Sequence, residues 1–275
     1  MALLSMNELT TYRWSFEDDV HRYAEAGIQS IGVWRQKLSD YGEEKGIELI
    51  SEVGLQVSNL MWAGGFTGSD GRSYNDAIAD ARDAIRLTAD LQADCLIVFS
   101  GSRGGHTTNH ANRLFNDALK ALMPVAMEFG VTLAVKPMDA GCARDWTFLT
   151  ELSETIDLLE KFDSPAIKLA FDTYHFGLDP NAIKLLDDIV PHIAIVQLGD
   201  AKERPTGEQN RCRLGEGVVP FAEIFSKLAA GGYQGSYDVK LLGEDIETYD
   251  YEDLLAHSKR QFESWHIPAP RPLER

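Results

Sequence analysis

The stretch TLAVKPMDAG, residues 132–141, shows the kind of strand from which this chain is built. Its apolar residues predict a buried β-strand that ends at Lys136-Pro137. A second stretch, SYDVKLLGE (236–244), again brings a lysine, Lys240, to the end of an apolar strand. The end of such a strand usually points into a pocket. Two lysines at two separated strand ends therefore need an explanation.

Apolar runs of the same kind recur at regular intervals, and helical patterns separate them. The runs occupy residues 30–34, 55–62, 95–100, 131–136, 166–171, 192–198 and 236–241, with a shorter candidate at 6–12. Eight strands, each followed by a helix, without a change of composition or a Pro/Ser-rich linker, predict a single (β/α)8 TIM barrel of the α/β class over residues 1–275. An open doubly wound sheet is the alternative, but the glycines of GSRGGHTT (101–108) lack the GxGxxG spacing.

The helical patterns carry their own end signals. Ser15 is placed to cap the start of one helix, and Gly27 is placed at its end. Gly130 closes another helical pattern, and residues 73–91 repeat apolar side chains at helical spacing. These segments are expected to cover the outside of the barrel.

The composition is that of an ordinary globular protein, with 44% hydrophobic and 25% charged residues. The net charge of −17 argues against nucleic acid as a partner, although a local cationic pocket can still hold a small anion. No apolar stretch is long enough for a membrane span, and the N-terminal residues lack the pattern of a signal peptide. Cys95, Cys142 and Cys212 are scattered without metal-type spacing, so a reducing cytoplasm is the expected location. A homo-oligomer is compatible with these data.

In a barrel of this kind, functional residues lie where each strand meets its following helix. The candidates are therefore the polar and aromatic residues that end strands: Trp34, Arg35, Trp62, Ser100, Lys136, Asp172, Gln197, Asp200 and Lys240. Trp34 and Trp62 suit stacking on the face of a sugar, although tryptophans at strand ends are often core residues.

Four stretches carry a resemblance to a known family. They are GIQSIGVWRQKLSDYG (27–42), GLQVSNLMWAGGF (54–66), LAFDTYHFGLDP (169–180) and CRLGEGVVPFAEIFSKLAAGGYQGSYDV (212–239). Together they resemble the xylose isomerase-like TIM barrels, the sugar-phosphate isomerase/epimerase family, which is also similar to the tagatose epimerases and to endonuclease IV. The likeness covers nearly the whole chain, and FDTYHFG and LGEGVVPF are its most specific elements.

The resemblance implies a metal site whose ligands this chain has replaced. Enzymes of the family hold one divalent metal between a Glu, an Asp, a His and a Glu at the ends of the fifth to eighth strands. The resemblance places Lys136, Asp172, Gln197 and Lys240 at these positions, with His175 at a neighbouring active-site histidine. A protonated lysine has three donors and no lone pair, so it cannot bind a cation. We therefore expect no metal and no other cofactor here.

Two roles remain open for the lysines. In the first, they polarise a substrate oxygen, and a lysine whose pKa is lowered by a neighbouring cation acts as a general base or forms a Schiff base. On this interpretation Lys136, Lys240, Asp172 and His175 are catalytic. In the second, Lys136 and Lys240 form salt bridges with Asp172 and hold together a site without catalytic function.

Substrate contacts are assigned to Gln197, Trp62, Trp34 and one arginine of the loop AKERPTGEQNRCRLGEG (201–217). Family members place a basic residue in this loop against the ligand. Spacing does not distinguish among the four basic residues that the loop offers: Lys202, Arg204, Arg211 and Arg213. Arg213 is selected as the candidate.

The predicted function is that of a metal-independent isomerase or epimerase that acts on a small sugar, keto-sugar or sugar acid by lysine-assisted proton transfer. A non-catalytic sugar-binding barrel and a Schiff-base lyase or aldolase are the alternatives. The cationic strand ends predict that anionic carbohydrates bind better than their neutral counterparts. Neither nucleic acid nor a membrane is an expected partner.

Overall fold

The computed structural model describes residues 2–267, and eight parallel strands within them close into a barrel. The strands are β1 (Leu3–Asn7), β2 (Ser30–Trp34), β3 (Gln56–Ala63), β4 (Leu96–Val98), β5 (Leu133–Val135), β6 (Ile167–Asp172), β7 (Ile193–Leu198) and β8 (Ser236–Val239). Each strand pairs with its neighbours in the sequence, and β1 pairs with β8 to close the ring. The predicted (β/α)8 barrel is confirmed.

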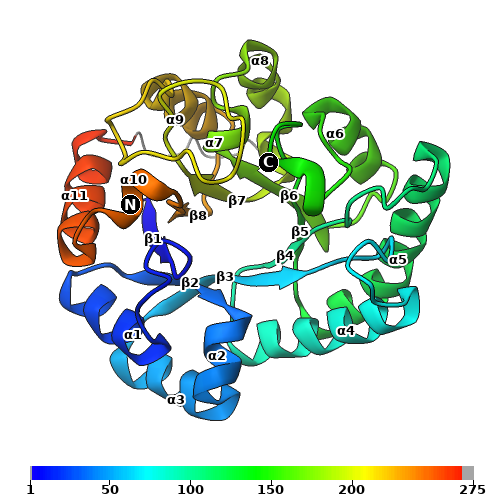
Figure 1. The fold of residues 1–275 in the computed structure, drawn as a ribbon, viewed down its shortest axis with the longest axis horizontal. Coiled ribbons are helices and arrows are strands. Elements are labelled where there is room, and N and C mark those ends of the chain that lie inside the picture. The colour runs from blue at the N-terminus through cyan, green and yellow to red at the C-terminus, as the bar shows by residue number, and fades with distance from the viewer. Residues whose placement is uncertain (1, 268–275) are drawn as a thin grey trace.

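The longer helices form an outer ring around the strands, and the four-residue helices α7 and α10 lie inside it near the strand ends (Figure 1). They are α1 (Phe16–Glu25), α2 (Arg35–Tyr41), α3 (Glu43–Val53), α4 (Tyr74–Asp90), α5 (Thr108–Phe129), α6 (Leu152–Glu160), α7 (Thr173–Phe176), α8 (Pro180–Ile189), α9 (Phe221–Ala230), α10 (Glu244–Glu247) and α11 (Tyr251–Ser264). Within residues 2–267, none of these helices is both long enough and apolar enough to span a membrane.

The predicted helix ends are confirmed with one small shift. The Ser15 side chain accepts a hydrogen bond from the backbone of Asp18, whose carboxylate in turn accepts from the backbone N–H of Ser15. Gly27, with a φ of 70°, follows the C-cap residue of α1 and does not itself cap the helix. Gly130 caps α5 at a φ of 69°, in the left-handed region that glycine favours.

The first strand lies earlier than the sequence indicates. The pattern at 6–12 predicted this strand, whereas β1 ends at Asn7. The chain turns immediately afterwards, because the backbone N–H of Thr10 donates to the Asn7 carbonyl at 2.8 Å. The Thr10 hydroxyl also donates to the Val239 carbonyl at 3.0 Å and ties this turn to β8.

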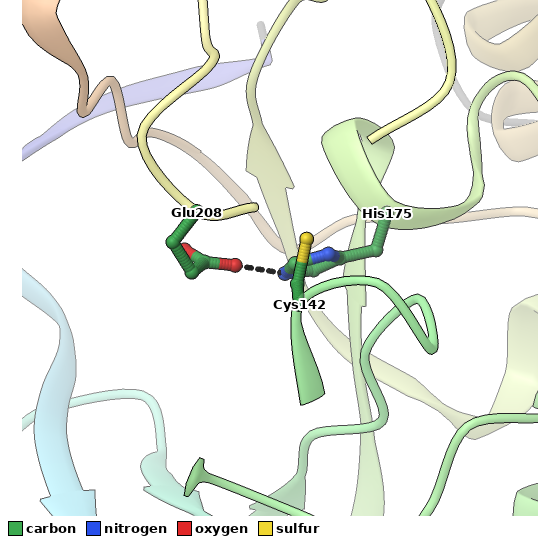
Figure 2. Close-up of side chains that lie close together, drawn as sticks. All are labelled: Cys142, His175 and Glu208. Carbon is green, nitrogen blue, oxygen red and sulfur yellow. Dashed lines mark ion pairs between the residues drawn. The ribbon is translucent and has the colours of Figure 1, made fainter. Parts of the chain in front are cut away.

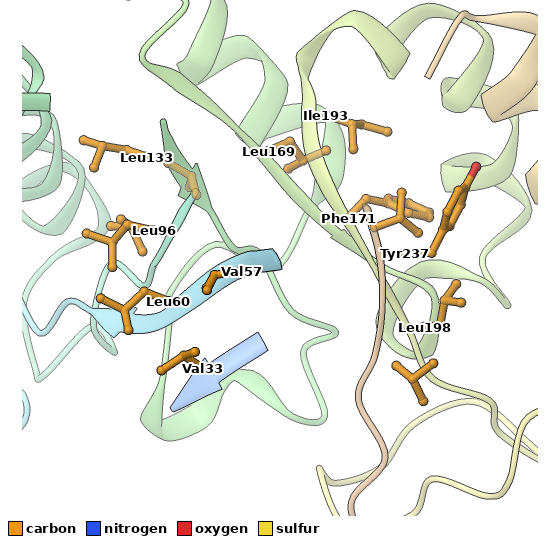
Figure 3. Close-up of a cluster of buried hydrophobic side chains, with 14 of the residues drawn as sticks. Val33, Val57, Leu60, Leu96, Leu133, Leu169, Phe171, Ile193, Leu198 and Tyr237 are labelled. Atoms are coloured by element: carbon orange, nitrogen blue, oxygen red, sulfur yellow. The ribbon is translucent and has the colours of Figure 1, made fainter. Parts of the chain in front are cut away.

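Alternate residues of the strands pack into two apolar clusters on opposite sides of the barrel wall. The larger cluster lies between strands and helices and includes Leu96, Leu133 and Leu169 (Figure 3). The smaller cluster fills the barrel and includes Ala134 and Ala170. Because side chains alternate, the residues two positions beyond Ala134 and Ala170 also face the inside of the barrel. These residues belong to the candidate site.

Candidate functional site

Four strand ends bring the residues predicted at the metal positions to one place inside the barrel mouth. Lys136 follows β5, Asp172 ends β6, Gln197 lies near the end of β7 and Lys240 follows β8. The register pairs Asp172 with Gln197 across β6 and β7. The exposed fraction of these four residues is at most 3%.

Lys136 makes the central contacts. Its Nζ donates to Asp172 Oδ2 at 2.6 Å and to the Oε1 atom of Gln197. The amide nitrogen of Gln197 donates in the other direction, to Asp238 Oδ2 at 3.1 Å. An acceptor at one end and a donor at the other fix the orientation of the Gln197 amide, which in turn positions the lysine.

Asp238, on β8, supports this arrangement from deeper inside the barrel. In addition to Gln197, its Oδ2 atom accepts hydrogen bonds from Asn7 Nδ2 at 2.7 Å and from Asn59 Nδ2 at 3.0 Å. Burial raises the pKa of Asp238. A Cβ atom at Gly32 would lie 2.7 Å from Asp238 Oδ1, so only glycine leaves room for this polar group. Sequence reasoning did not identify Asp238.

The loop between β7 and α9, yellow in Figure 1, adds two charged residues that the prediction did not select. Arg211 Nη1 lies 3.2 Å from Asp172 Oδ1, and its guanidinium stacks on Tyr174 with 3.9 Å to the ring centroid. Arg211 Nη2 lies 3.0 Å from Glu208 Oε2. The exposed fraction of Arg211 is 1%.

Arg211, and not Arg213, is therefore the loop arginine at the strand ends. Arg213 forms an ion pair with Glu216 and lies over the ring of Tyr249, 4.2 Å from its centroid. A turn begins at Arg213, whose carbonyl accepts from the backbone N–H of Glu216 at 3.0 Å. The backbone N–H of Arg211 donates instead to the Leu242 carbonyl at 3.2 Å. Arg213 thus lies away from the strand ends in this structure, and its predicted contact with a substrate stays a prediction.

His175 lies beside these groups on the short helix α7, with Glu208 and Cys142 around it (Figure 2). Its Nε2 atom is 2.9 Å from Glu208 Oε1 and 3.7 Å from Asp172 Oδ2. A sulfur, a ring nitrogen and a carboxylate oxygen of Cys142, His175 and Glu208 lie within 4.8 Å of one another. No spacing could have predicted this group, because its members come from three separate segments. We refer to Lys136, Cys142, Asp172, His175, Gln197, Glu208, Arg211 and Lys240 together as the strand-end cluster.

Neither part of the strand-end cluster fits a divalent metal. At the four family positions, two lysines stand in place of two carboxylates. At the second group, Glu208 Oε2 already lies 3.0 Å from Arg211 and 3.6 Å from Lys240, so cations compete for its charge. Burial raises the pKa of the Cys142 thiol to about 12, which opposes the thiolate form that a metal requires.

The cluster has an excess of positive charge. Its ionisable groups outside His175 and Cys142 are Lys136, Lys240 and Arg211 (three positive charges) and Asp172 and Glu208 (two negative charges), for a formal +1. Although burial opposes ionisation, the neighbouring cations hold the pKa values of Asp172 and Glu208 well below their usual range. Burial lowers the pKa of His175 and favours its neutral form.

The pKa of Lys136 bears most directly on the chemistry of the cluster. Burial, with help from Lys240 and Arg211, lowers its pKa to about 8, although Asp172 acts in the opposite direction. A fraction of Lys136 is therefore a neutral amine with a free lone pair near neutral pH. Such an amine accepts a proton or attacks a carbonyl.

The two predicted tryptophans lie in a cavity that the strand-end cluster does not line, beside Arg35, Arg72 and Asp80. Trp34 and Trp62 line a cavity of about 370 Å³, together with Met61. Trp62 packs edge-on against Trp146, with 5.0 Å between ring centroids, so its ring is held in place. The Met61 sulfur lies 3.8 Å from the Gln197 amide nitrogen and thus connects the cavity wall to the cluster.

Comparison with known proteins agrees with this architecture. Residues 20–261 match the family model described as xylose isomerase-like TIM barrel. L-ribulose-5-phosphate 3-epimerase UlaE of Escherichia coli O1:K1 is 29% identical over 140 residues, which are 50% of this chain and 46% of the relative. The matched part of the chain thus spans about half the length of the curated relatives.

Two solved structures share the fold. Protein SMc04130 from Sinorhizobium meliloti 1021 superposes with a TM-score of 0.87 and 24% identity, over 98% of both chains. The IOLI protein with a binding zinc atom gives a TM-score of 0.84 and 17% identity, over 96% of this chain and 97% of that one. At these identities the structures support the fold alone. With the family match over residues 20–261, we conclude that the chain belongs to the xylose isomerase-like TIM-barrel family, which includes sugar isomerases and epimerases.

Proposed function

We propose that this protein is a metal-independent sugar isomerase or epimerase in which Lys136 transfers a proton of a small sugar, keto-sugar or sugar acid. The observation that carries the proposal is the environment of Lys136. Its Nζ atom is buried at a strand end, lies 2.6 Å from Asp172 Oδ2, and has a pKa lowered to about 8. A general base is most effective when its pKa lies near the working pH.

The proposed reaction begins with a substrate carbonyl near the cationic side chains. Neutral Lys136 removes the proton from the carbon next to the carbonyl, so a C–H bond breaks and an N–H bond forms. The electron pair moves to the carbonyl oxygen, and the charges of Lys240 and Arg211 stabilise the resulting enediolate. For epimerisation, protonated Lys240 gives a proton to the other face of the same carbon. For isomerisation, Lys136 returns its proton to the former carbonyl carbon while the hydroxyl proton moves from the neighbouring oxygen to the former carbonyl oxygen, so that the new carbonyl forms at the neighbouring carbon.

A carbohydrate substrate is supported by two observations. Trp34 and Trp62 line a cavity that includes Met61, whose sulfur lies 3.8 Å from the Gln197 amide nitrogen, and aromatic rings suit the apolar face of a sugar. The E. coli relatives are L-ribulose-5-phosphate 3-epimerases, which favours an epimerase-type reaction for this chain. The formal +1 charge of the cluster supports an anionic substrate within a chain of net charge −17.

Deuterium exchange tests this proposal. The protein is incubated in D2O with a panel of ketoses and keto-acid sugars, in the presence of EDTA, and loss of C–H signals is followed by NMR. We expect exchange next to the carbonyl in the presence of EDTA, and no exchange with Lys136→Met. Exchange that EDTA abolishes and zinc restores would contradict the proposal.

The same samples separate the alternatives. Binding without exchange for the substrates tested would favour a non-catalytic sugar-binding barrel. Borohydride treatment, followed by mass measurement of the peptide that contains Lys136, would reveal a Schiff base. The proposal predicts an unmodified Lys136 peptide.

A further inference from the structure

The strand-end cluster is closed in this structure. Lys136, Asp172 and Gln197 are fully buried, and His175 and Lys240 are at most 3% exposed. A ligand can therefore touch these side chains only after part of the protein has moved. The contacts around Glu208 indicate which segment moves and which group the ligand replaces.

Glu208 occupies a position that suits a bound carboxylate. Its Oε2 atom lies 3.0 Å from Arg211 Nη2 and 3.6 Å from Lys240 Nζ, and its Oε1 atom lies 2.9 Å from His175 Nε2. Its side chain is 16% exposed. Three nitrogen atoms from three different elements thus surround one carboxylate group, in the way that proteins surround a carboxylate ligand.

The chain after Glu208 is firmly held. The backbone N–H of Cys212 donates to the Asp200 carbonyl at 3.1 Å. The Asp200 carboxylate accepts from the backbone N–H groups of Gly215 and Gly217 at 2.8 and 2.9 Å. A Cβ atom at Gly217 would lie 2.1 Å from Asp200 Oδ1, so this packing is tight. Arg211 therefore has a fixed backbone from which it reaches the site.

The chain before Glu208 is held more weakly. Lys202 pairs with Asp245 at 3.2 Å, and both side chains are about two-thirds exposed. Arg204 pairs with Asp139 at 3.1 Å, with the arginine 76% exposed. Exposed ion pairs contribute little to stability. The Tyr174 hydroxyl also donates to the Gly207 carbonyl, and Asn210 Nδ2 donates to Thr206 Oγ1 at 3.1 Å. Segment 202–209 therefore lifts only when these two hydrogen bonds break together with the exposed ion pairs, while the backbone bonds that hold Arg211 stay in place.

We propose that Glu208 is an internal ligand that fills a carboxylate-binding subsite, and that the carboxylate of a sugar acid replaces it when segment 202–209 lifts. The inference rests on the proposed function for the carbohydrate part of the ligand. It adds the class of the ligand, a sugar acid, and the side chains that bind its acid group: Arg211, Lys240 and His175.

Charge balance makes the replacement of Glu208 selective for sugar acids. When Glu208 leaves, the formal charge of the cluster rises from +1 to +2, because one carboxylate is lost from three cations and two anions. A sugar acid restores the +1 state, whereas a neutral sugar leaves an additional buried cation without a partner. Such a cation is costly in a buried site. Neutral sugars therefore displace Glu208 less readily than sugar acids do.

Chemical rescue tests the subsite without a sugar. Glu208→Ala removes the internal carboxylate and leaves space beside the three nitrogen atoms. We expect sodium acetate to raise the Tm of Glu208→Ala by at least about 2 °C over sodium chloride at equal ionic strength, because acetate binds only the folded protein. Wild type should show no acetate-specific rise. Glu216→Ala is the matched control, since Glu216 pairs with Arg213 in the same loop, and it should also show none.

Calorimetry with gluconate and glucose tests the displacement. Glu208→Gln keeps the side-chain shape but removes the competing charge, so it serves even if Glu208→Ala does not fold. We expect either variant to bind gluconate about 10-fold more tightly than wild type does, with little change for glucose. Equal gluconate affinity in wild type and Glu208→Gln would overturn the displacement.

The two proposals fail separately. The carboxylate subsite would be overturned if acetate did not raise the Tm of Glu208→Ala. It would also be overturned if acetate raised the Tm of wild type, Glu208→Ala and Glu216→Ala to the same extent. Failure of the proposed function would instead appear as no C–H exchange by wild type. Since the acetate measurement involves no carbohydrate and no turnover, it decides the subsite in either case.

Discussion

Two buried groups of charges lie at the barrel mouth, and their excess charges have opposite signs. The strand-end cluster has three cations and two carboxylates inside the barrel. The second group, which we call the α1–α2 cluster, contains Glu8, Asp19 and Lys37 and has two carboxyl groups for one cation. It lies where β1 ends and helices α1 and α2 begin.

The α1–α2 cluster fixes helices to the barrel. Lys37 of α2 forms an ion pair with Asp19 of α1 and donates to the Thr11 carbonyl at 3.0 Å. Glu8 accepts from the backbone N–H of Trp34 at 2.6 Å. Burial raises the pKa of Asp19 to about 6, and burial together with Asp19 raises the pKa of Glu8. The excess negative charge is thus relieved when a carboxyl group takes up a proton.

The strand-end cluster balances its charge differently. Its two carboxylates have lowered pKa values, and Lys136 has a pKa lowered to about 8. Lys136 therefore releases its proton at a pH just above neutral, whereas Asp19 of the other cluster takes up a proton at a pH just below neutral. This difference is the reason why we assign chemistry to the strand-end cluster and only structural support to the α1–α2 cluster.

The largest expected effect is on activity. Lys136→Met should lower the rate of C–H exchange by about 10²- to 10⁴-fold, the usual contribution of a general base. Its free energy of unfolding should remain sufficient for a folded protein, as measured by circular dichroism. Exchange at the wild-type rate would assign the base to another residue.

Lys37→Met should show the opposite pattern. Removing the one cation leaves Asp19 and Glu8 buried together, and we expect a loss of about 3–5 kcal/mol in the free energy of unfolding. Urea titration at pH 7 measures the loss. If the fraction that remains folded has a strongly reduced exchange rate, the division between a chemical and a structural cluster is wrong.

The charge of the ligand should have a smaller effect, on the free energy of binding. We expect a hexonate to bind more tightly than its parent hexose by about 1–2 kcal/mol, the scale of one charge-assisted hydrogen bond. Calorimetric titration of the matched pair compares the two affinities. Equal affinity would mean that Asp172 and Glu208 neutralise the cations and leave no charge to select a ligand.

The smallest expected effect concerns pH and the α1–α2 cluster. Raised carboxyl pKa values contribute stability that is complete below the unfolded-state pKa of about 4 and is lost as the pH rises through the folded-state values. Glu8→Gln should therefore be more stable than wild type at pH 8, by less than the ligand-charge effect, and should differ little from wild type at pH 4. Urea titrations of both proteins at the two pH values test this. The same difference at both pH values would show that Glu8 is ionised throughout.

Much of the fold and part of the site follow from local sequence patterns. Alternation along each strand places Lys136, Asp172, Gln197 and Lys240 on the inner face, so their convergence could be predicted from a closed barrel. Asp238 could also have been predicted, because it lies two residues before Lys240 and its side chain therefore faces the same way.

The remaining site residues could not be predicted in this way. Glu208, Arg211 and Cys142 lie in loops whose side-chain directions depend on contacts that are distant in sequence, such as the backbone bond between Arg211 and Leu242. The first strand was misplaced because Thr10 binds Val239, a residue of the last strand. No local pattern contains that contact.

The most direct test of the account is the metal content of the purified protein, together with its triple variant. Because lysines stand in place of two metal ligands, elemental analysis of wild type should find no stoichiometric divalent metal. Lys136→Glu, Gln197→His and Lys240→Glu combined should bind zinc in calorimetry, whereas each single change should not, because at least one lysine remains at the site. One tightly bound zinc, manganese or cobalt per wild-type chain would contradict the account.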